Sequence, residues 1–226
     1  SVMVKKLVAV GCSYTEDWND FPAWPELLAK KLNYECINLG QNGSGNECIY
    51  SKSLDALLEE KNIGLMVAMW SEFHRMDWYL GKVGWSTIHY NVDGRIRNHA
   101  KWKEDITDIF VKNGWNNKKH QINRTLRFMF SLQNLCEIYE VPFMQVFGTD
   151  PCSKNEKYDA AKLILDSPFF DSIKCLGWPI VDNMGGWTMD TELNEDTHRI
   201  SERDFHPSKE GHEVISEILF NNVKNL

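Results

Sequence analysis

Residues 7–13 read Leu-Val-Ala-Val-Gly-Cys-Ser, an apolar run of four residues that ends at a glycine. A short apolar run without alternating polar residues is typical of a strand buried on both faces of a sheet. Ser13 then lies in a tight turn after this strand, where its hydroxyl would be presented at the carboxyl edge of the sheet. An acyl-transfer nucleophile requires such a position, although a glycine and serine after a strand are common by themselves.

Strands and helices alternate along most of the remaining chain. The pattern predicts further strands at 34–39, 63–69 and 141–147, with 180–181 as a candidate fifth, and helices at 25–32, 47–61, 122–139 and 209–223. This alternation predicts a single three-layer α/β domain over residues 1–226, with a mostly parallel sheet of about five strands. Active-site residues in such domains gather at the carboxyl ends of the strands.

The alternation is interrupted between about residues 75 and 124. This insertion is rich in aromatic residues, namely Trp78, Tyr79, Trp85, Tyr90, Trp102 and Trp115. A structureless loop of that length is unusual inside a compact domain, so we expect a small subdomain or lid. Its rings would either stack on a sugar substrate or pack the insertion onto the body of the domain, and the sequence leaves both open.

Composition excludes several classes of protein. The 226 residues are 42% apolar and 25% charged, with a formal net charge of -7, which is ordinary for a globular domain. The acidic balance argues against a nucleic-acid partner, because phosphate binding needs concentrated lysine and arginine. No apolar run approaches the roughly 18 residues of a membrane helix, and residues 7–10 are shorter than a signal-peptide core. We therefore expect a soluble, cytoplasmic protein with no membrane partner.

The cysteines predict no metal site. The six cysteines form no Cys-x-x-Cys pair and have no zinc-like spacing to histidine. We expect free thiols in a reducing compartment.

A second cluster of polar residues precedes the last predicted helix, in the run Asp204-Phe205-His206-Pro207-Ser208. A histidine in this position can act as a general base, while a carboxylate two residues away orients its ring. Ser208 is a suitable N-cap for the helix. The run Asp196-Thr197-His198 has the same spacing but no proline or helix after it, so we expect it to be a surface loop.

Taken in order, these blocks resemble the SGNH (GDSL-like) hydrolase superfamily: Gly-x-Ser after the first strand, a Gly/Asn-rich turn after the second, and Asp-x-His-Pro before the last helix. The resemblance covers the layout of the whole chain except the 75–124 insertion. It implies a flavodoxin-like α/β/α fold and a serine hydrolase that needs no cofactor. It also implies that Ser13 is the nucleophile, His206 the general base and Asp204 the acid that orients the histidine.

The resemblance also implies an oxyanion hole. The segment Asn38-Leu39-Gly40-Gln41-Asn42-Gly43 matches the block whose glycine amide contributes, so the amides of Ser13 and Gly43 are the expected donors, with Gly45 as an alternative. The third block of the family carries an asparagine donor, but here Ser71 stands at that position. Either the Ser71 hydroxyl or the side chain of Asn46 would then take its place.

Two other positions depart from the family pattern. Cys12 replaces the usual aspartate before the serine, and we expect its thiol to be buried on the side opposite to Ser13. Arg203 stands where the family usually has its acid, three residues before the histidine. If Asp204 does not reach the ring, a backbone carbonyl would orient His206 and leave a Ser-His dyad.

The sequence therefore predicts a serine esterase acting on a short-chain acyl ester, a small molecule or the O-acetyl group of a carbohydrate. An O-acyltransferase would use the same residues, and a non-catalytic module that binds a glycan or protein is the alternative from another class. The turn at 40–45 lacks the spacing of a phosphate loop. Glu72 and Asp77 are expected on the solvated surface rather than as a glycosidase pair. The oligomeric state is not predicted.

Overall fold

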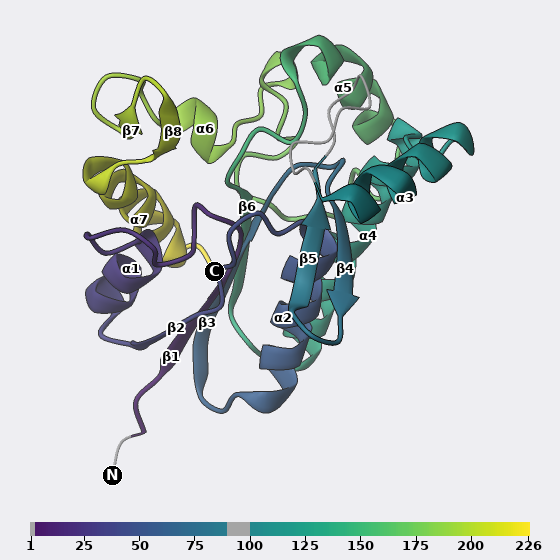
Figure 1. Ribbon diagram of the computed structural model, residues 1–226. Helices are drawn as coiled ribbons and strands as arrows, with labels where there is room; N and C mark the ends of the chain where they lie inside the picture. The colour runs from purple at the N-terminus through teal and green to yellow at the C-terminus, as the bar shows by residue number, and fades with distance from the viewer. Residues whose placement is uncertain (1–2, 90–99) are drawn as a thin grey trace.

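The centre of the molecule is a parallel sheet. The computed structural model describes residues 3–89 and 100–226. The sheet has the strand order β2-β1-β3-β6 and consists of β1 (Lys6–Val10), β2 (Glu35–Asn38), β3 (Ile63–Trp70) and β6 (Phe143–Phe147). Neighbouring strands in this sheet are all parallel, so their carboxyl ends meet at one edge, which is the upper edge in Figure 1.

Helices cover both faces of the sheet. On one face α1 (Trp24–Leu32) packs against α7 (Lys209–Val223), and on the other α2 (Asn46–Glu59) packs against α4 (Lys118–Ile138). Helix α5 (Lys157–Leu165), which follows the short 3-10 helix η1 (Lys154–Glu156), lies beside α4. The predicted three-layer α/β/α architecture with a mostly parallel sheet is confirmed.

Strand β1 shows why the first apolar run decides this fold. Leu7 and Ala9 belong to the core under α1 and α7, whereas Val8 and Val10 belong to the core under α2 and α4. All four side chains are fully buried. Because successive strand residues point to opposite faces, a strand between two helical layers must be apolar at every position.

The predicted strand at 180–181 is wrong. Ile180 has a left-handed φ of 67°, and Val181 precedes the 3-10 helix η2 (Asp182–Met184). Pro179 has no amide hydrogen for a strand ladder, and the Ile180 amide donates back to the Gly177 carbonyl. Beyond β6, a single bridge between Val146 and Leu176 extends the sheet in the described part of the chain, so it has four strands rather than about five.

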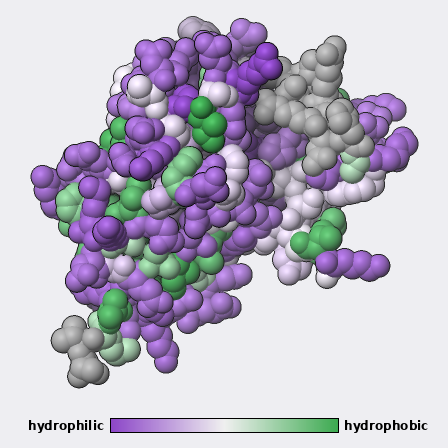
Figure 2. Space-filling view, turned by 60° about the vertical axis from the view of Figure 1, so that its left-hand side comes forward, coloured by the Kyte–Doolittle hydropathy of each residue, from purple (hydrophilic) through white to green (hydrophobic). Residues whose placement is uncertain are grey.

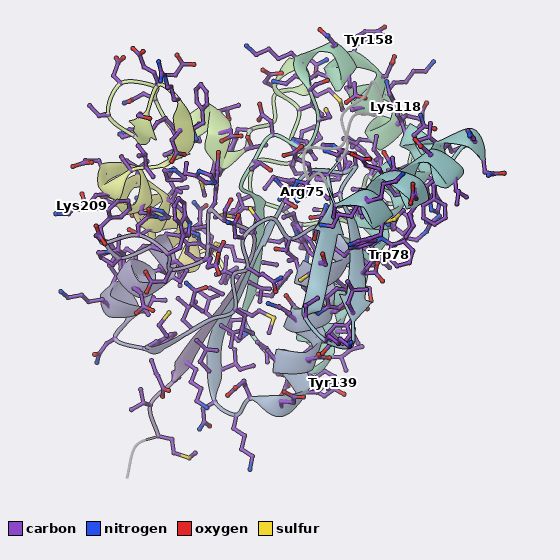
Figure 3. The ribbon with its side chains drawn as sticks, viewed as in Figure 1. Arg75, Trp78, Lys118, Tyr139, Tyr158 and Lys209 are labelled. Carbon is purple, nitrogen blue, oxygen red and sulfur yellow. The ribbon has the colours of Figure 1, made fainter. Side chains whose placement is uncertain are left out.

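The insertion forms an antiparallel hairpin of β4 (Met76–Leu80) and β5 (Gly84–Ile88), followed by α3 (Lys101–Lys112). Trp78, labelled in Figure 3, stacks on Phe110 of α3 with ring centroids 6.0 Å apart, and Phe110 in turn contacts Trp115. These rings pack α3 onto the hairpin. Tyr79, by contrast, is largely exposed, and Tyr90 lies outside the described residues.

A second hairpin, not predicted from the sequence, precedes α7. It pairs β7 (Arg199–Ser201) with β8 (Asp204–Pro207) and follows the short helix α6 (Met189–Glu192). In Figure 1 this hairpin stands above the carboxyl edge of the sheet, on the side of α1 and α7. The run that precedes the last helix is therefore held in a strand from Asp204 to Pro207.

The surface is mostly polar. Figure 2 shows a face that is largely hydrophilic, with only scattered hydrophobic side chains. Across residues 3–89 and 100–226, no helix is long and apolar enough to cross a membrane.

The packing of α7 on α1 makes stability depend on pH. His212 of α7 is buried, its Nδ1 accepts the Trp24 amide hydrogen at 3.0 Å, and burial lowers its pKa from an ordinary 6.5 to about 4. The unfolded chain therefore binds a proton between these values that the folded chain does not. We expect acidification from pH 7.5 to pH 5 to destabilise the fold by roughly 1–2 kcal/mol through this residue.

Urea denaturation of the wild type and His212→Asn at both pH values checks this expectation. The asparagine oxygen can accept the Trp24 amide, so the variant should lose part of the pH dependence. An unchanged difference between the two pH values would assign the effect to other groups.

Candidate active site

The turn after β1 places Ser13 at the carboxyl edge of the sheet. The Cys12 carbonyl accepts the amides of Thr15 and Glu16 at 2.9 and 3.1 Å, which closes the turn. Gly11 is required because a Cβ at this position would collide with the Thr15 side chain. Ser13 is only 6% exposed, so its hydroxyl is shielded from solvent on most sides.

The structure brings the side chains of Ser13, His206 and Asp204 together. Ser13 Oγ lies 3.1 Å from His206 Nε2, and His206 Nδ1 lies 2.6 Å from Asp204 Oδ1. The same carboxylate oxygen accepts the His206 backbone amide at 3.1 Å. Strand β8 therefore delivers the histidine and its acid as one unit to the turn after β1, and Asp204 reaches the ring from two residues away.

The charge state of Asp204 sets the tautomer of the histidine. Although partial burial opposes it, the hydrogen bonds from the His206 ring and amide hold the pKa of Asp204 below its ordinary value. The ionised carboxylate can only accept, so Nδ1 of His206 carries the hydrogen of this contact. Nε2 is then left with a lone pair for the Ser13 hydroxyl, the arrangement that general-base catalysis requires.

Two aromatic rings flank the histidine, and the sequence did not point to either. The rings of Tyr14 and Trp18 meet His206 edge to face, with centroids 6.0 and 5.0 Å away. Trp18 Nε1 also donates to the Ser13 carbonyl at 2.9 Å. Their contacts restrict the ring orientation of His206.

A partly buried ion pair between Arg199 and Asp190 ties the histidine strand to the Ser13 turn. The Tyr14 hydroxyl donates to Asp190 Oδ1 at 2.6 Å. Arg199 Nη1 donates both to this carboxylate oxygen and to the Phe205 carbonyl, at 3.0 and 2.9 Å. Burial and the Asp190 charge raise the pKa of Tyr14, so it remains a donor. The residue before His206 is thereby fixed relative to the residue after Ser13.

In the described part of the chain, one backbone amide of the turn at 40–45 donates to no protein acceptor. Within the described part of the chain, the amides of Gly40, Gln41, Asn42, Ser44 and Gly45 all donate to protein acceptors. The Gly43 amide has no such acceptor, and neither does that of Ser13. Since the Gly45 amide is committed to Asp77, Gly43 is the better of the two candidate glycines for an oxyanion donor.

Ser71 and Asn46 are buried and bonded to each other and to their surroundings. The Ser71 hydroxyl donates to the Ser44 carbonyl at 2.9 Å. Asn46 Nδ2 donates to the Ser71 carbonyl and to Thr125 Oγ1, both at 3.0 Å, and Asn46 Oδ1 accepts the Ser71 amide. In this arrangement neither side chain has a hydrogen left for an oxyanion. They instead join the end of β3 to the start of α2.

Asp77 is not on the solvated surface, contrary to the prediction. It is 6% exposed, and its two carboxylate oxygens accept the amides of Gly45 and Cys48 at 2.8 and 2.9 Å. The Thr87 hydroxyl also donates to it. Asp77 therefore caps the N-terminus of α2 from the hairpin. Burial raises the pKa of its carboxyl, while the positive potential at the amide end of the helix and the amide hydrogen bonds favour the charge.

Glu72 also has protein partners rather than an open surface. It is half-buried and contacts Arg75 Nη2 at 3.0 Å and His74 Nε2 at 3.1 Å. Arg75, labelled in Figure 3 at the upper end of β4, donates to the Ser44 carbonyl as well. These contacts hold the turn at 40–45 from the side of the insertion.

Cys12 and His198, which the sequence analysis also considered, do not belong to the cluster of Ser13, His206 and Asp204. Cys12 is fully buried in the core under α1 and α7, and all six cysteines are free thiols. His198 Nδ1 accepts the Asn194 amide at 3.0 Å, so this histidine closes a surface loop.

Gly43 gives a prediction of its own. Its φ of 77° is left-handed, and a Cβ would lie 3.2 Å from His89 Nε2, which bonds the Gly43 carbonyl at 2.8 Å. For the ester hydrolysis that the sequence predicts, Gly43→Ala is expected to turn the amide and lower kcat by about 10²- to 10³-fold, the cost of one oxyanion donor. KM should change much less. Gly81→Ala is the control, because its Cβ meets nothing within 4 Å; an equal loss there would contradict the assignment.

Comparison with known proteins shows which solved structures share this fold. No protein-family model and no curated protein sequence matches the chain. Among solved structures, a protein from Desulfitobacterium hafniense assigned to the G-D-S-L lipolytic family is 14% identical, with a TM-score of 0.56 over 96% of this chain and 98% of that one. A protein from Slackia heliotrinireducens assigned as an SGNH hydrolase is 13% identical, with a TM-score of 0.51 over 97% and 98%.

A third structure, the α/β hydrolase LAE5 from the metagenome of Lake Arreo, is 13% identical and has a TM-score of 0.50 over 97% of this chain and 95% of that one. The chain thus has the fold of the SGNH (GDSL-like) hydrolases, as the resemblance predicted. Identities this low establish the fold alone, and the chemistry has to be argued from the residues at the site.

Proposed function

We propose that the protein is an SGNH-type serine esterase that hydrolyses short-chain acyl esters. The observation that carries the proposal is the continuous chain of contacts from Ser13 through His206 to Asp204, at 3.1 and 2.6 Å. A hydroxyl, an imidazole and an ionised carboxylate in this order form the acyl-transfer arrangement known from unrelated folds.

In the first half of the reaction, Ser13 Oγ attacks the ester carbonyl as its proton passes to His206 Nε2. The amides of Ser13 and Gly43 donate to the oxyanion of the tetrahedral intermediate. The bond to the leaving oxygen then breaks, His206 returns the proton to the alcohol, and an acyl-serine remains. In the second half, His206 takes a proton from water, whose oxygen attacks the acyl carbon, and the carboxylic acid leaves as Ser13 recovers its proton.

The substrate class is proposed as acetyl and similarly short esters of an alcohol, with O-acetylated carbohydrate as the natural form. The support for a carbohydrate is Trp85, a partly buried ring at a pocket beside Gly43, where it can stack on a sugar. An acyltransferase would differ only in using an alcohol in place of water, so the products distinguish the two activities.

Labelling with a fluorophosphonate probe tests the proposal. We expect one adduct, located by mass spectrometry on the peptide that contains Ser13, and hydrolysis of p-nitrophenyl acetate and butyrate by the unlabelled protein. The ratio of the two esters reports the acyl length. A folded protein that neither takes up the probe nor hydrolyses these esters would instead be a non-catalytic binding module.

A further inference from the structure

A buried lysine without an acidic partner lies near the Gly43 turn. Lys103 of α3 is 6% exposed, and its Nζ donates to the Thr87 carbonyl at 2.9 Å. An ammonium group has three hydrogens to donate. Among residues 3–89 and 100–226, no carboxylate forms an ion pair with this group, and burial lowers its pKa.

Three other shielded cations of the described chain have a carboxylate partner. Arg75 pairs with Glu72, Arg199 with Asp190, and Lys157 with Asp150. Burial of a charge is costly unless an opposite charge or several hydrogen bonds compensate it. Lys103 has one carbonyl acceptor and a cation–π contact with the Trp102 ring, whose centroid lies 5.5 Å from Nζ. Among the described residues, therefore, no negative charge balances Lys103.

Lys103 lines an open pocket that extends to the Gly43 turn. The pocket has a volume of about 420 Å³, and its walls include Gln41, Asn42, Gly43, Trp85, His89 and Lys103. In Figure 1 the two parts of the insertion that contribute, β5 and α3, lie next to each other above the α2 side of the sheet. Among the described residues, the lining of this pocket contains neither aspartate nor glutamate.

The other polar groups of this pocket do not supply the missing charge. Burial and the nearby Arg75 lower the pKa of His89 to about 4, so His89 is a neutral ring that bonds the Gly43 carbonyl. The Gln41 side chain is held between the Trp85 carbonyl and Lys52, at 3.0 and 2.8 Å. Among the described residues that line this pocket, Lys103 is thus the cationic side chain that can attract an anion.

We propose that this pocket is a substrate subsite for a carboxylate, so that the preferred esters carry an acidic group in addition to the acyl ester. The inference rests on the proposed esterase function, because the pocket is placed relative to the reacting carbonyl by Gly43. An acylated acidic sugar has the required chemistry: a carboxylate for Lys103 and a ring face for Trp85. An oxyanion of another kind, such as a phosphate, is an outcome that the experiment distinguishes.

The kinetic test compares esters that differ in charge. We would measure kcat/KM for 4-acetoxybenzoate and mono-p-nitrophenyl succinate, which carry a carboxylate on the alcohol and acyl side, against the neutral 4-acetoxybenzamide and p-nitrophenyl acetate. The wild type is expected to favour at least one anionic ester by about tenfold over its neutral counterpart. Lys103→Met should remove that preference. Because each ratio is taken within one preparation, partial unfolding of the variant does not affect it.

Lys101→Met is the matched control, since Lys101 is an exposed neighbour on α3 that pairs with Asp105; the ratio should stay at its wild-type value. No preference for either anionic ester, or a preference that survives Lys103→Met, overturns the subsite. A preference for 4-acetoxyphenyl phosphate over both carboxylates would overturn the carboxylate assignment.

A binding measurement separates this inference from the esterase itself. Saturation-transfer NMR with glucuronate and glucose should show contact for glucuronate in the Ser13→Ala protein, which cannot turn over an ester, and loss of that contact in Lys103→Met. Glucuronate binding without esterase activity would refute the proposed function and retain the anion site. Esterase activity with equal signals from glucuronate and glucose would refute the anion site and retain the proposed function.

Discussion

Replacing Ser13 or His206 by alanine is expected to lower kcat/KM for p-nitrophenyl acetate by about 10⁴- to 10⁶-fold, and the double variant should be no worse than either single one. The reason is geometric. Ser13 Oγ and His206 Nε2 share one hydrogen bond of 3.1 Å, so neither group performs the proton transfer without the other. Independent roles would instead multiply the two losses.

Cys12→Ala is the control for the choice of nucleophile. Its thiol is fully buried in the core on the α1 side, so the variant should keep kcat/KM within a few-fold while losing some stability. Activity that survives Ser13→Ala and disappears in Cys12→Ala would reverse the assignment. Circular dichroism of each variant establishes that the comparison is made between folded proteins.

Much of the fold was predictable because its signals are local. The run at 7–10 is apolar at every position since both of its faces are covered, and the strand at 63–70 has no polar side chain either. The strand at 143–147 is apolar except for Gln145, which is buried and accepts a hydrogen bond from Trp70 Nε1. The Ser208 side chain accepts the Gly211 amide at 3.1 Å, as expected of an N-cap, which is a local feature as well. Such patterns can be recognised from neighbouring residues in the sequence, without knowing which distant residues pack against them.

The errors arose where distant residues decide the outcome. Asp77 looks like a surface residue in the sequence, yet the hairpin fold brings it against the amides of Gly45 and Cys48. Arg199 and Asp190 gave no signal, because their connection to the Ser13 turn through Tyr14 spans most of the chain. The same holds for Lys103, since the role proposed for it depends on which described residues surround it in space rather than on its neighbours in sequence.

The use of Ser71 and Asn46 shows the same limitation at the site itself. Their position after β3 and at the start of α2 is compatible with an oxyanion donor, and sequence reasoning stops there. In the structure the two side chains satisfy each other and the Ser44 carbonyl. The oxyanion would then depend on two backbone amides, which makes the Gly43 amide more critical than in a site with a third donor.

Asp204→Asn is expected to lower kcat by about 10⁴-fold with little change in structure. The asparagine amide can donate a hydrogen toward His206 Nδ1, which favours the tautomer that carries its hydrogen on Nε2. That hydrogen would face Ser13 Oγ, where a lone pair is needed to accept the serine proton. The loss therefore comes from the wrong tautomer rather than from an absent side chain. The measurement is kcat for p-nitrophenyl acetate between pH 6 and 10.

The chain carries its own control in Asp196, which stands at the same spacing before His198. His198 Nδ1 accepts the Asn194 amide instead of facing a carboxylate, so Asp196→Asn should leave kcat unchanged. If Asp204→Asn lost less than about tenfold, the carboxylate would be dispensable and Ser13 and His206 would act as a dyad. The contact of 2.6 Å between Asp204 Oδ1 and His206 Nδ1, with the lowered pKa of Asp204, favours the larger loss.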